Sequence, residues 1–239
     1  MDKKIYLDYD PKYQGVVKTA AYMMFVCTAI FLVQVALLIS NTQLFGYAGI
    51  GDWDKFLRMI DTNAIPFIVI NLNFIALRVL YIVVFLGYIV ATWNLNKSAA
   101  LSYLGFALVS LPVILVSHVF QLSLTPLAHE YVKAAINPGS TEALSYLINA
   151  KMVYTMTDWG DAFVALVLFN GLLISWLFIA FKKPHPKYCG WWILLLIVLP
   201  IGRFVGLPIL GLANAFLTAL FILVTGIMML RFTPAQNRL

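Results

Sequence analysis

Apolar residues in this chain gather in long stretches separated by short polar segments. About six stretches reach the length of roughly 20 residues that an α-helix needs to cross the hydrocarbon core of a bilayer. The pattern therefore predicts an all-α fold, a polytopic transmembrane helical bundle that forms a single domain over residues 1–239. The predicted spans are Val16–Ser40, Ile65–Trp93, Ser98–Leu127, Gly160–Phe181, Cys189–Leu207 and Gly211–Leu230.

The last two predicted spans are joined by almost no polar sequence. One long helix is the alternative, but proline and glycine interrupt the stretch repeatedly, and these residues end or kink helices. The interrupting residues are Pro200, Gly202, Gly206, Pro208 and Gly211. We therefore expect two helices here.

A short amphipathic helix is predicted between the first two spans, over Asp52–Asp61. Apolar residues recur at the helical spacing in this segment, and charged residues take the opposite face. The apolar positions are Trp53, Phe56, Leu57 and Ile60. Such a helix lies at the membrane interface. It is interpreted as a lid packed on the helix ends, with a gate over a binding site as the alternative.

A second short helix is predicted outside the membrane, over Thr141–Thr157. The Asn137-Pro138-Gly139 turn precedes it, and either Ser140 or Thr141 has a side chain suited to cap its first turn. Its predicted buried stripe consists of Leu144, Leu147 and Ile148. The sequence thus places two short interfacial helices on the outer side of the bundle.

Composition agrees with a membrane location. Hydrophobic residues make up 62% of the chain and charged residues only 11%, whereas soluble domains average about half and about a quarter. The first apolar stretch, Val16–Ser40, is too long for the hydrophobic region of a signal peptide, so we expect a retained helix.

The distribution of positive charge predicts the orientation. The formal net charge is +6, but no basic patch with interleaved aromatic residues is present, so nucleic acid is not expected as a partner. With the N-terminus inside, the inner loops hold 10 of the lysines and arginines and the outer loops hold 4. Because cytoplasmic loops are enriched in Lys and Arg, both termini are predicted to be cytoplasmic. Binding of anionic lipid headgroups by the same loop lysines is an alternative role.

Polar residues inside predicted spans are the candidate functional groups, because each is costly in hydrocarbon. Nearly all of them fall in the outward half of the bilayer. The candidate ligand-binding residues are Asn71, Arg78, His118, Asp158, Asp161 and Arg203. An ion-pair network of the two arginines with Asp161 and Asp158 is expected, since an unpaired arginine in lipid costs several kcal/mol.

Two interpretations of this network stay open. It either holds the second, fourth and fifth helices together, or it lines an outward-facing polar cavity in which the arginines receive the anionic group of a small or lipid-like ligand.

Motifs for familiar catalytic and cofactor chemistry are missing from the sequence. A haem or a metal site needs histidines or carboxylates that converge, and His118 and His129 are too far apart along one predicted helix to share a metal. No HExxH, GxSxG or P-loop pattern occurs. No catalytic residue is assigned, no metal is expected, and the sequence identifies no cofactor.

Several stretches resemble a large group of bacterial six-helix membrane proteins classified only as a domain of unknown function. They are LSYLGFALVSL (Leu101–Leu111), HEYVKA (His129–Ala134), TDWGDAFVALVLFNGLL (Thr157–Leu173) and KPHPKYCGWW (Lys183–Trp192). In order and spacing they are similar to that family's third span, outer loop, fourth span and next cytoplasmic turn, over about the last two-thirds of the chain. The resemblance implies a multi-pass protein of the bacterial cytoplasmic (inner) membrane.

The chain departs from that family's pattern at one place. An Arg and a Glu often follow the glycine–aromatic pair of the family's third span, where this sequence has Ala107 and, near it, Ser110. The resemblance therefore implies a fold and supplies no activity.

Three functions remain open. The sequence favours a non-catalytic membrane protein that binds a lipid or small anionic ligand, or that serves as an accessory subunit beside other membrane proteins. A small-molecule or ion transporter is the second, but it needs polar groups through both leaflets. An intramembrane enzyme acting on a lipid-like substrate is the third, with Asp158, Asp161 and His118 as its only candidates.

Overall fold

The computed structural model describes residues 4–40, 52–94, 97–180 and 208–235, and these fold almost entirely as helices. Two short strands lie near the ends of the chain. In order, the elements are β1 (Ile5–Leu7), the 3-10 turn η1 (Pro11–Tyr13), α1 (Gln14–Ser40), α3 (Trp53–Thr62), α4 (Ala64–Thr92), α5 (Lys97–Leu122), α6 (Leu124–Ala134), α7 (Thr141–Ala180), α9 (Pro208–Arg231) and β2 (Phe232–Pro234).

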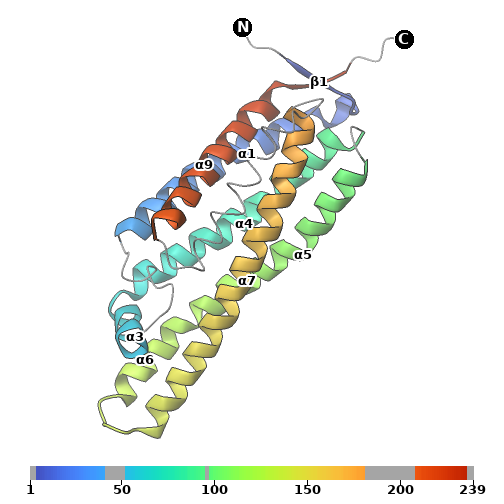
Figure 1. Ribbon diagram of the computed structural model, residues 1–239. Helices are drawn as coiled ribbons and strands as arrows, with labels where there is room; N and C mark the ends of the chain where they lie inside the picture. The colour runs from blue at the N-terminus through green and yellow to red at the C-terminus, as the bar shows by residue number, and fades with distance from the viewer. Residues whose placement is uncertain (1–3, 41–51, 95–96, 181–207, 236–239) are drawn as a thin grey trace.

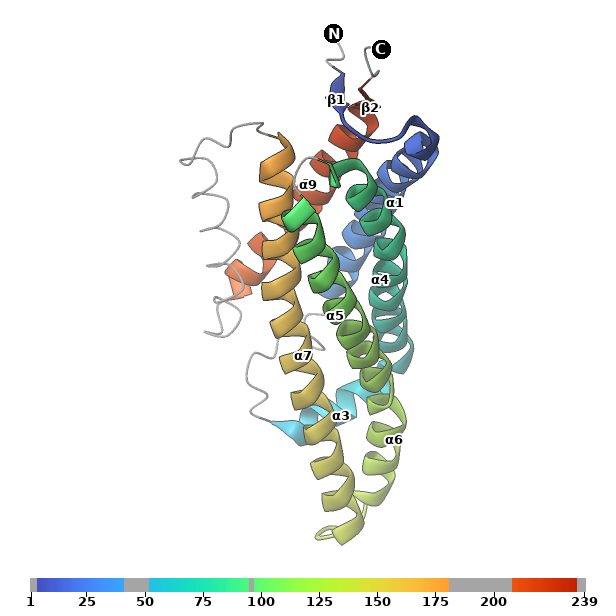
Figure 2. The ribbon, with the colours of Figure 1, turned by 90° about the vertical axis from the view of Figure 1, so that its right-hand side faces the viewer.

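Long helices pack side by side and form the main body of the molecule (Figures 1 and 2). Helix α1 packs on α4 and α9, α4 packs on α5, and α5 packs on α7. Glycines allow close approach at these contacts. A Cβ added at Gly87 of α4 would lie 2.2 Å from the Cβ of Ala20 in α1, and one at Gly160 would lie 2.5 Å from the Oγ of Ser117 in α5. We call α1, α4, α5, α9 and residues 158–180 of α7 the bundle.

Three helical stretches of the described residues are long and apolar enough to cross a membrane. They are Pro11–Leu37, Ala64–Thr92 and Ala107–Ala134, with 27, 29 and 28 residues. The outward-facing positions of α4 are themselves apolar, since Leu72, Val79 and Leu86 are each about half exposed. A helix with apolar residues on its exposed face as well as its buried face is suited to lipid rather than water. These features fit the predicted transmembrane fold.

Four of the predicted spans agree in position with single helices of the described residues. Val16–Ser40 lies in α1, Ile65–Trp93 matches α4 to within a residue, and Gly211–Leu230 lies in α9. Residues 160–180 of the predicted span Gly160–Phe181 form the second half of α7, and Phe181 and the span Cys189–Leu207 lie outside the described residues.

The third predicted span, Ser98–Leu127, is not one helix. It divides at Ser123 into α5 and α6. Pro126 explains the division, because proline has no N–H to donate to the carbonyl of Leu122 and its ring crowds that carbonyl.

A second packed region lies at the end of the molecule away from the termini, where α3, α6 and residues 141–157 of α7 meet (Figure 1). We call this region the cap. Its core is a separate apolar cluster to which all three helices contribute. Phe56, Leu57 and Ile60 of α3 are fully buried in it, which confirms the amphipathic pattern predicted for Asp52–Asp61.

The second predicted interfacial helix is wrong in its extent. Residues 141–157 are the first half of a continuous helix of 40 residues, α7. At 1.5 Å per residue this helix is about 60 Å long, roughly twice the hydrocarbon thickness of a bilayer. No proline interrupts it, so the outer segment and the span join without a break. Ser140 caps its start, accepting a hydrogen bond from the N–H of Ala143 over 3.2 Å.

The buried stripe predicted for this segment is wrong at two of its three residues, since Leu147 packs partly buried against the cap core but Leu144 and Ile148 do not. Leu144 and Ile148 are 54% and 49% exposed, whereas Ala143 and Ala150 are buried. Small residues at these two positions let α7 lie close against α6. Leu144 and Ile148 therefore point away from the cap core.

The two ends of the chain meet at the opposite end of the bundle (Figures 1 and 2). Strand β1 pairs in parallel with β2, with Ile5 opposite Phe232. Leu7, Tyr9 and Phe232 are buried beneath this pair. Gln14 of α1 donates from Nε2 to the carbonyl of Phe232 over 3.2 Å, and the Tyr9 hydroxyl donates to Gln14 Oε1. We call residues 5–9 and 232–235 the terminal clasp.

Candidate functional site

A buried hydrogen-bonded pair joins α4 and α5 in the part of the bundle nearer the cap. Asn71 and His118, both predicted site residues, are 0% and 2% exposed. Asn71 Oδ1 lies 3.2 Å from His118 Nδ1, and its Nδ2 donates to the carbonyl of Phe67 over 3.0 Å. Because Oδ1 can only accept, Nδ1 carries the proton in this contact. The imidazole also stacks on Phe74, with ring centroids 4.6 Å apart.

Arg78 lies on the same face of α4, two helical turns farther from the cap. Its Nε is buried and has no hydrogen-bond partner. The guanidinium carbon lies 5.5 Å from the centre of the Tyr81 ring, and the thiol of Cys27 on α1 is within its electrostatic reach. A cation near the middle of a 29-residue apolar helix is costly unless an anion or several acceptors meet it.

The predicted ion-pair network is not formed among the described residues. The ion pairs found there lie at the cap and at the start of the chain, and none includes Arg78. Asp158 is partly buried on α7, which packs mainly on α5 and α6, whereas Arg78 lies on α4, which packs mainly on α1 and α5. The two helices that carry these side chains therefore do not pack closely on each other.

Two further predicted site residues are not described in side-chain detail. Asp161 lies within the α7 helix, but its side chain is outside the described part of the structure, and Arg203 is outside it entirely. Their predicted contacts with Arg78 stay predictions.

Sequence reasoning missed one buried polar residue of the bundle, Gln34 on α1. Its side chain is 0% exposed, and neither Oε1 nor Nε2 has a hydrogen-bond partner among the described residues. A signal for it exists in the sequence, because Gln34 is the one amide in the otherwise apolar stretch Ala29–Ile39.

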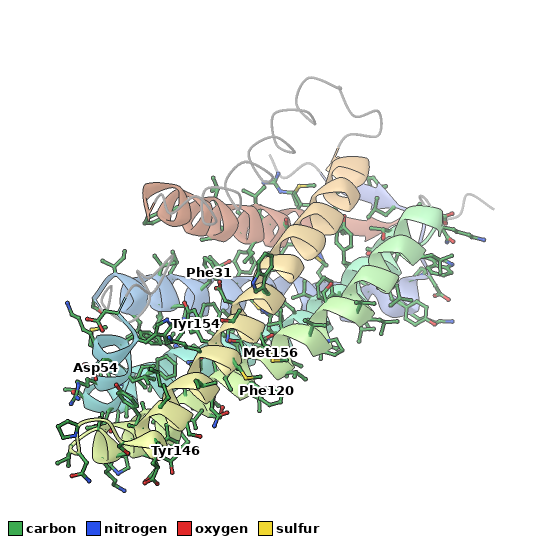
Figure 3. The ribbon with its side chains drawn as sticks, turned by 60° about the horizontal axis from the view of Figure 1, so that its bottom comes forward. Phe31, Asp54, Phe120, Tyr146, Tyr154 and Met156 are labelled. Carbon is green, nitrogen blue, oxygen red and sulfur yellow. The ribbon has the colours of Figure 1, made fainter. Side chains whose placement is uncertain are left out.

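The cap closes the molecule beyond the Asn71–His118 pair. Tyr154 of α7 points toward α3 (Figure 3) and meets the rings of Trp53 and Phe56 edge to face, at centroid distances of 5.6 and 5.4 Å. Hydrogen bonds and an ion pair add to these contacts among Trp53, Phe56 and Tyr154. Asp54 accepts a hydrogen bond from the Tyr131 hydroxyl over 2.8 Å and pairs with an arginine one turn along α3. These contacts fit the predicted lid.

His129 makes a second link between the helices of the cap. Its Nδ1 lies 2.9 Å from the carboxylate of Asp61, which joins α6 to the end of α3. In the described ranges, no group of three or more His, Cys, Asp or Glu side chains converges. In the described bundle, the groups that can contact a ligand are hydrogen-bonding side chains and the guanidinium of Arg78.

Comparison with known proteins gives no relative from which a function could be transferred. No family model, no curated protein and no solved structure matches this chain.

Proposed function

We propose that this chain is a membrane protein with about six spans whose bundle binds an amphiphilic ligand carrying an anionic group. In this proposal both termini face the cytoplasm of a bacterial cell and the cap faces outward from the inner membrane. Two observations support the topology. The termini meet at one end of the bundle, as an even number of crossings requires, and the positive loop residues favour that end.

The guanidinium of Arg78 carries the binding proposal. Its Nε is buried without a hydrogen bond, and no described carboxylate forms an ion pair with the side chain. Leaving a charged donor unmet in an apolar interior costs about 1–3 kcal/mol or more. An anionic ligand removes that cost, and guanidinium groups bind carboxylates and phosphates through paired hydrogen bonds.

The surroundings of Arg78 suit an amphiphile. Apolar side chains flank it on α4, and the Asn71–His118 pair offers neutral polar groups two turns toward the cap. A ligand with an anionic group and an apolar body therefore finds matching chemistry along one face of α4.

Lipid selectivity tests the proposal. The full-length chain is extracted gently, and bound lipids are measured by native mass spectrometry after addition of equal amounts of phosphatidylglycerol and phosphatidylcholine. The natural sequence is expected to retain the anionic lipid preferentially, and Arg78→Leu is expected to lose that preference. Arg58→Leu is the matched control, because Arg58 is exposed on the cap. An unchanged preference in Arg78→Leu would refute the proposal.

The orientation has its own test. In a chain whose two cysteines are replaced by alanine, single cysteines are introduced as Ser140→Cys in the cap and Thr233→Cys in the terminal clasp. A membrane-impermeant maleimide added to intact cells is expected to label the first and spare the second. The opposite labelling would reverse the proposed topology.

Exposed apolar residues on α7 favour a second candidate, an accessory subunit of a membrane complex. Leu144, Ile148, Met152 and Met156 follow one another a helical turn apart and are 49–72% exposed. Much of this stripe lies in the cap, where water would otherwise cover it, and such patches mark protein contacts. Met152→Asp is expected to reduce the mass of the gently extracted assembly in native gels, and an unchanged mass would count against this candidate.

A further inference from the structure

The side-chain amide of Gln34, which has no hydrogen-bond partner among the described residues, lies on the face of α1 that is turned toward α4. Ala20, Cys27 and Gln34 succeed one another at two-turn intervals on one face of α1. Ala20 meets Gly87 of α4, and Cys27 lies within the electrostatic reach of Arg78 of α4. The next position on this face, Gln34, therefore turns toward the same helix.

Antiparallel packing also fixes the level of Gln34 in the bundle. It lies two turns beyond Cys27 toward the cap on α1, and Asn71 lies two turns before Arg78, also toward the cap, on α4. Ala20 of α1 meets Gly87 of α4. Gln34 is 14 residues from Ala20 and Asn71 is 16 residues from Gly87, both toward the cap, so Gln34 and Asn71 lie within about one helical turn of each other in level. His118 bonds to Asn71 from α5. Three helices thus contribute a polar side chain to one layer of the bundle.

Two other buried polar side chains of the bundle, Thr28 and Asn71, are hydrogen-bonded within the chain. Thr28, one turn from Cys27 on α1, donates to the carbonyl of Met24 over 2.8 Å, and Asn71 makes the two contacts described above. Gln34 differs, because both of its polar atoms are buried without a partner in the described residues. A buried group of this kind usually meets a water molecule or a ligand.

We propose that Gln34 binds a hydroxyl group of the ligand whose anionic group Arg78 receives. This inference rests on the function proposed above and specifies the ligand's chemistry. A primary amide offers one acceptor oxygen and two donor hydrogens. A hydroxyl both donates and accepts, so it satisfies the two faces of the amide, whereas a phosphate oxygen only accepts and an ammonium only donates.

The separation of the two groups defines the ligand class further. The backbones of Gln34 and Arg78 lie two helical turns apart in level, about 10 Å, and both side chains are long enough to reach into the space between those levels. One headgroup that carries a phosphodiester and a hydroxyl can therefore contact both. The site takes an anionic lipid with a hydroxylated headgroup.

A pair of lipids that differ only at the hydroxyl tests this inference. Phosphatidylglycerol and phosphatidylmethanol with identical acyl chains are both monoanionic phosphodiesters, and only the first carries headgroup hydroxyls. The full-length chain is incubated with equal amounts of these two lipids and phosphatidylcholine, and bound lipids are counted by native mass spectrometry. The natural sequence is expected to favour phosphatidylglycerol over phosphatidylmethanol about tenfold, the scale of one buried hydrogen bond.

Gln34→Leu is expected to abolish that tenfold selectivity while both anionic lipids still outcompete phosphatidylcholine. Gln121→Leu is the control, because the Gln121 amide already donates to Thr157 on α7 over 3.3 Å, and its selectivity should match the natural sequence. Melting temperatures measured on the same samples confirm that each variant is folded.

Three other results are possible, and each contradicts either the role of Gln34 or the proposed binding of anionic lipid. If Gln34→Leu keeps the selectivity between the two anionic lipids, the inference is wrong and the proposed function stands. If Gln34→Leu keeps it and also melts at a higher temperature, the amide holds only water, and the inference is equally overturned. If the natural sequence shows no preference for anionic lipids, the proposed function fails and the inference with it.

Discussion

The bundle and the cap are both built from packed helices, but they place polar residues in opposite ways. In the bundle, the exposed side chains of α4 are leucine, valine and isoleucine, while the amides of Gln34 and Asn71 lie inside. In the cap, Phe56, Leu57 and Ile60 of α3 lie inside, while Asp54 and Arg58 pair on the exposed face. The two regions are thus organised for different surroundings.

The difference shows which interaction holds each region together. The cap excludes water from aromatic and aliphatic side chains, so the hydrophobic effect stabilises it. Bundle helices surrounded by lipid gain little from that effect, because lipid tails are as apolar as leucine. Close contacts at small residues, such as Gly87 against Ala20, and hydrogen bonds such as Asn71–His118 matter more there. Four changes test this comparison.

The largest effect is expected from truncating the aromatic centre of the cap. Phe56 is 0% exposed and contacts the rings of Trp53 and Tyr154. Phe56→Ala should destabilise the cap by about 3–5 kcal/mol. Hydrogen exchange should rise in α3 and α6 and change little in α1 and α4. Phe120→Ala, which removes a 56% exposed ring from α5 (Figure 3), should leave exchange in the cap unchanged. Equal effects of the two truncations would remove the distinction between the regions.

A smaller loss, located in the bundle, is expected from adding one methyl group at a helix contact. Gly87→Ala places a Cβ 2.2 Å from that of Ala20 and 3.1 Å from the carbonyl oxygen of Val16. Helices α1 and α4 must separate, at a cost of about 1–3 kcal/mol, seen as a lower melting temperature in detergent. Gly105→Ala is the control, since nothing lies within 4 Å of its added Cβ, and helix propensity predicts equal or higher stability. Similar melting temperatures for both variants would argue against tight packing in the bundle.

A modest effect is expected from the polar surface of the cap. Asp54→Asn removes the ion pair with Arg58, 2.9 Å long and roughly half exposed, and weakens the acceptor of the Tyr131 hydroxyl. Exposed pairs contribute about 0–1 kcal/mol, so the loss should stay near or below about 1 kcal/mol. A double-mutant cycle with Tyr131→Phe measures the hydrogen bond separately. A loss as large as that of Phe56→Ala would mean that polar contacts, rather than apolar burial, hold the cap.

The smallest effect concerns the terminal clasp and appears only at high pH. Burial raises the pKa of Tyr9 from 10.0 to about 12. Between these values the folded chain keeps the phenol proton and the unfolded chain releases it, so stability falls as pH rises. The difference in melting temperature between the natural sequence and Tyr9→Phe should therefore decrease from about pH 10 to about pH 12. Tyr6→Phe, at a 55% exposed position, is the control for the loss of a tyrosine hydroxyl from the terminal clasp.

Much of the fold could be predicted because long apolar stretches and amphipathic spacing are local signals. The ranges of α1, α4 and α9 and the buried face of α3 follow from the sequence pattern alone. Two residues of the stripe predicted on the first half of α7, Leu144 and Ile148, were wrong for a physical reason. The helical periodicity of this stripe allows either face to be buried, and contact with α6 selected the face with Ala143 and Ala150.

The candidate site could be predicted in part. Polar residues deep in apolar stretches identified Asn71 and His118, which the fold brings into contact. The pair of Arg78 with Asp158 was not found, because helix order in the sequence does not say which helices are neighbours, and α7, which carries Asp158, packs on α5 rather than on α4. Gln34 is visible in the sequence as the one amide of an apolar stretch, but its lack of partners among the described residues is a property of packing.

By itself, the sequence determined that this chain forms long apolar helices suited to a membrane, and that a short amphipathic helix lies between the first two. Those properties depend on the order of residue types within one or two turns. Only the tertiary structure decided that α7 runs unbroken from cap to bundle, that the chain ends pair as strands, and that the Gln34 amide is buried without a partner among the described residues. These three features depend on which helix faces contact each other. Close packing of small residues, between segments that are far apart in the chain, selects those contacts.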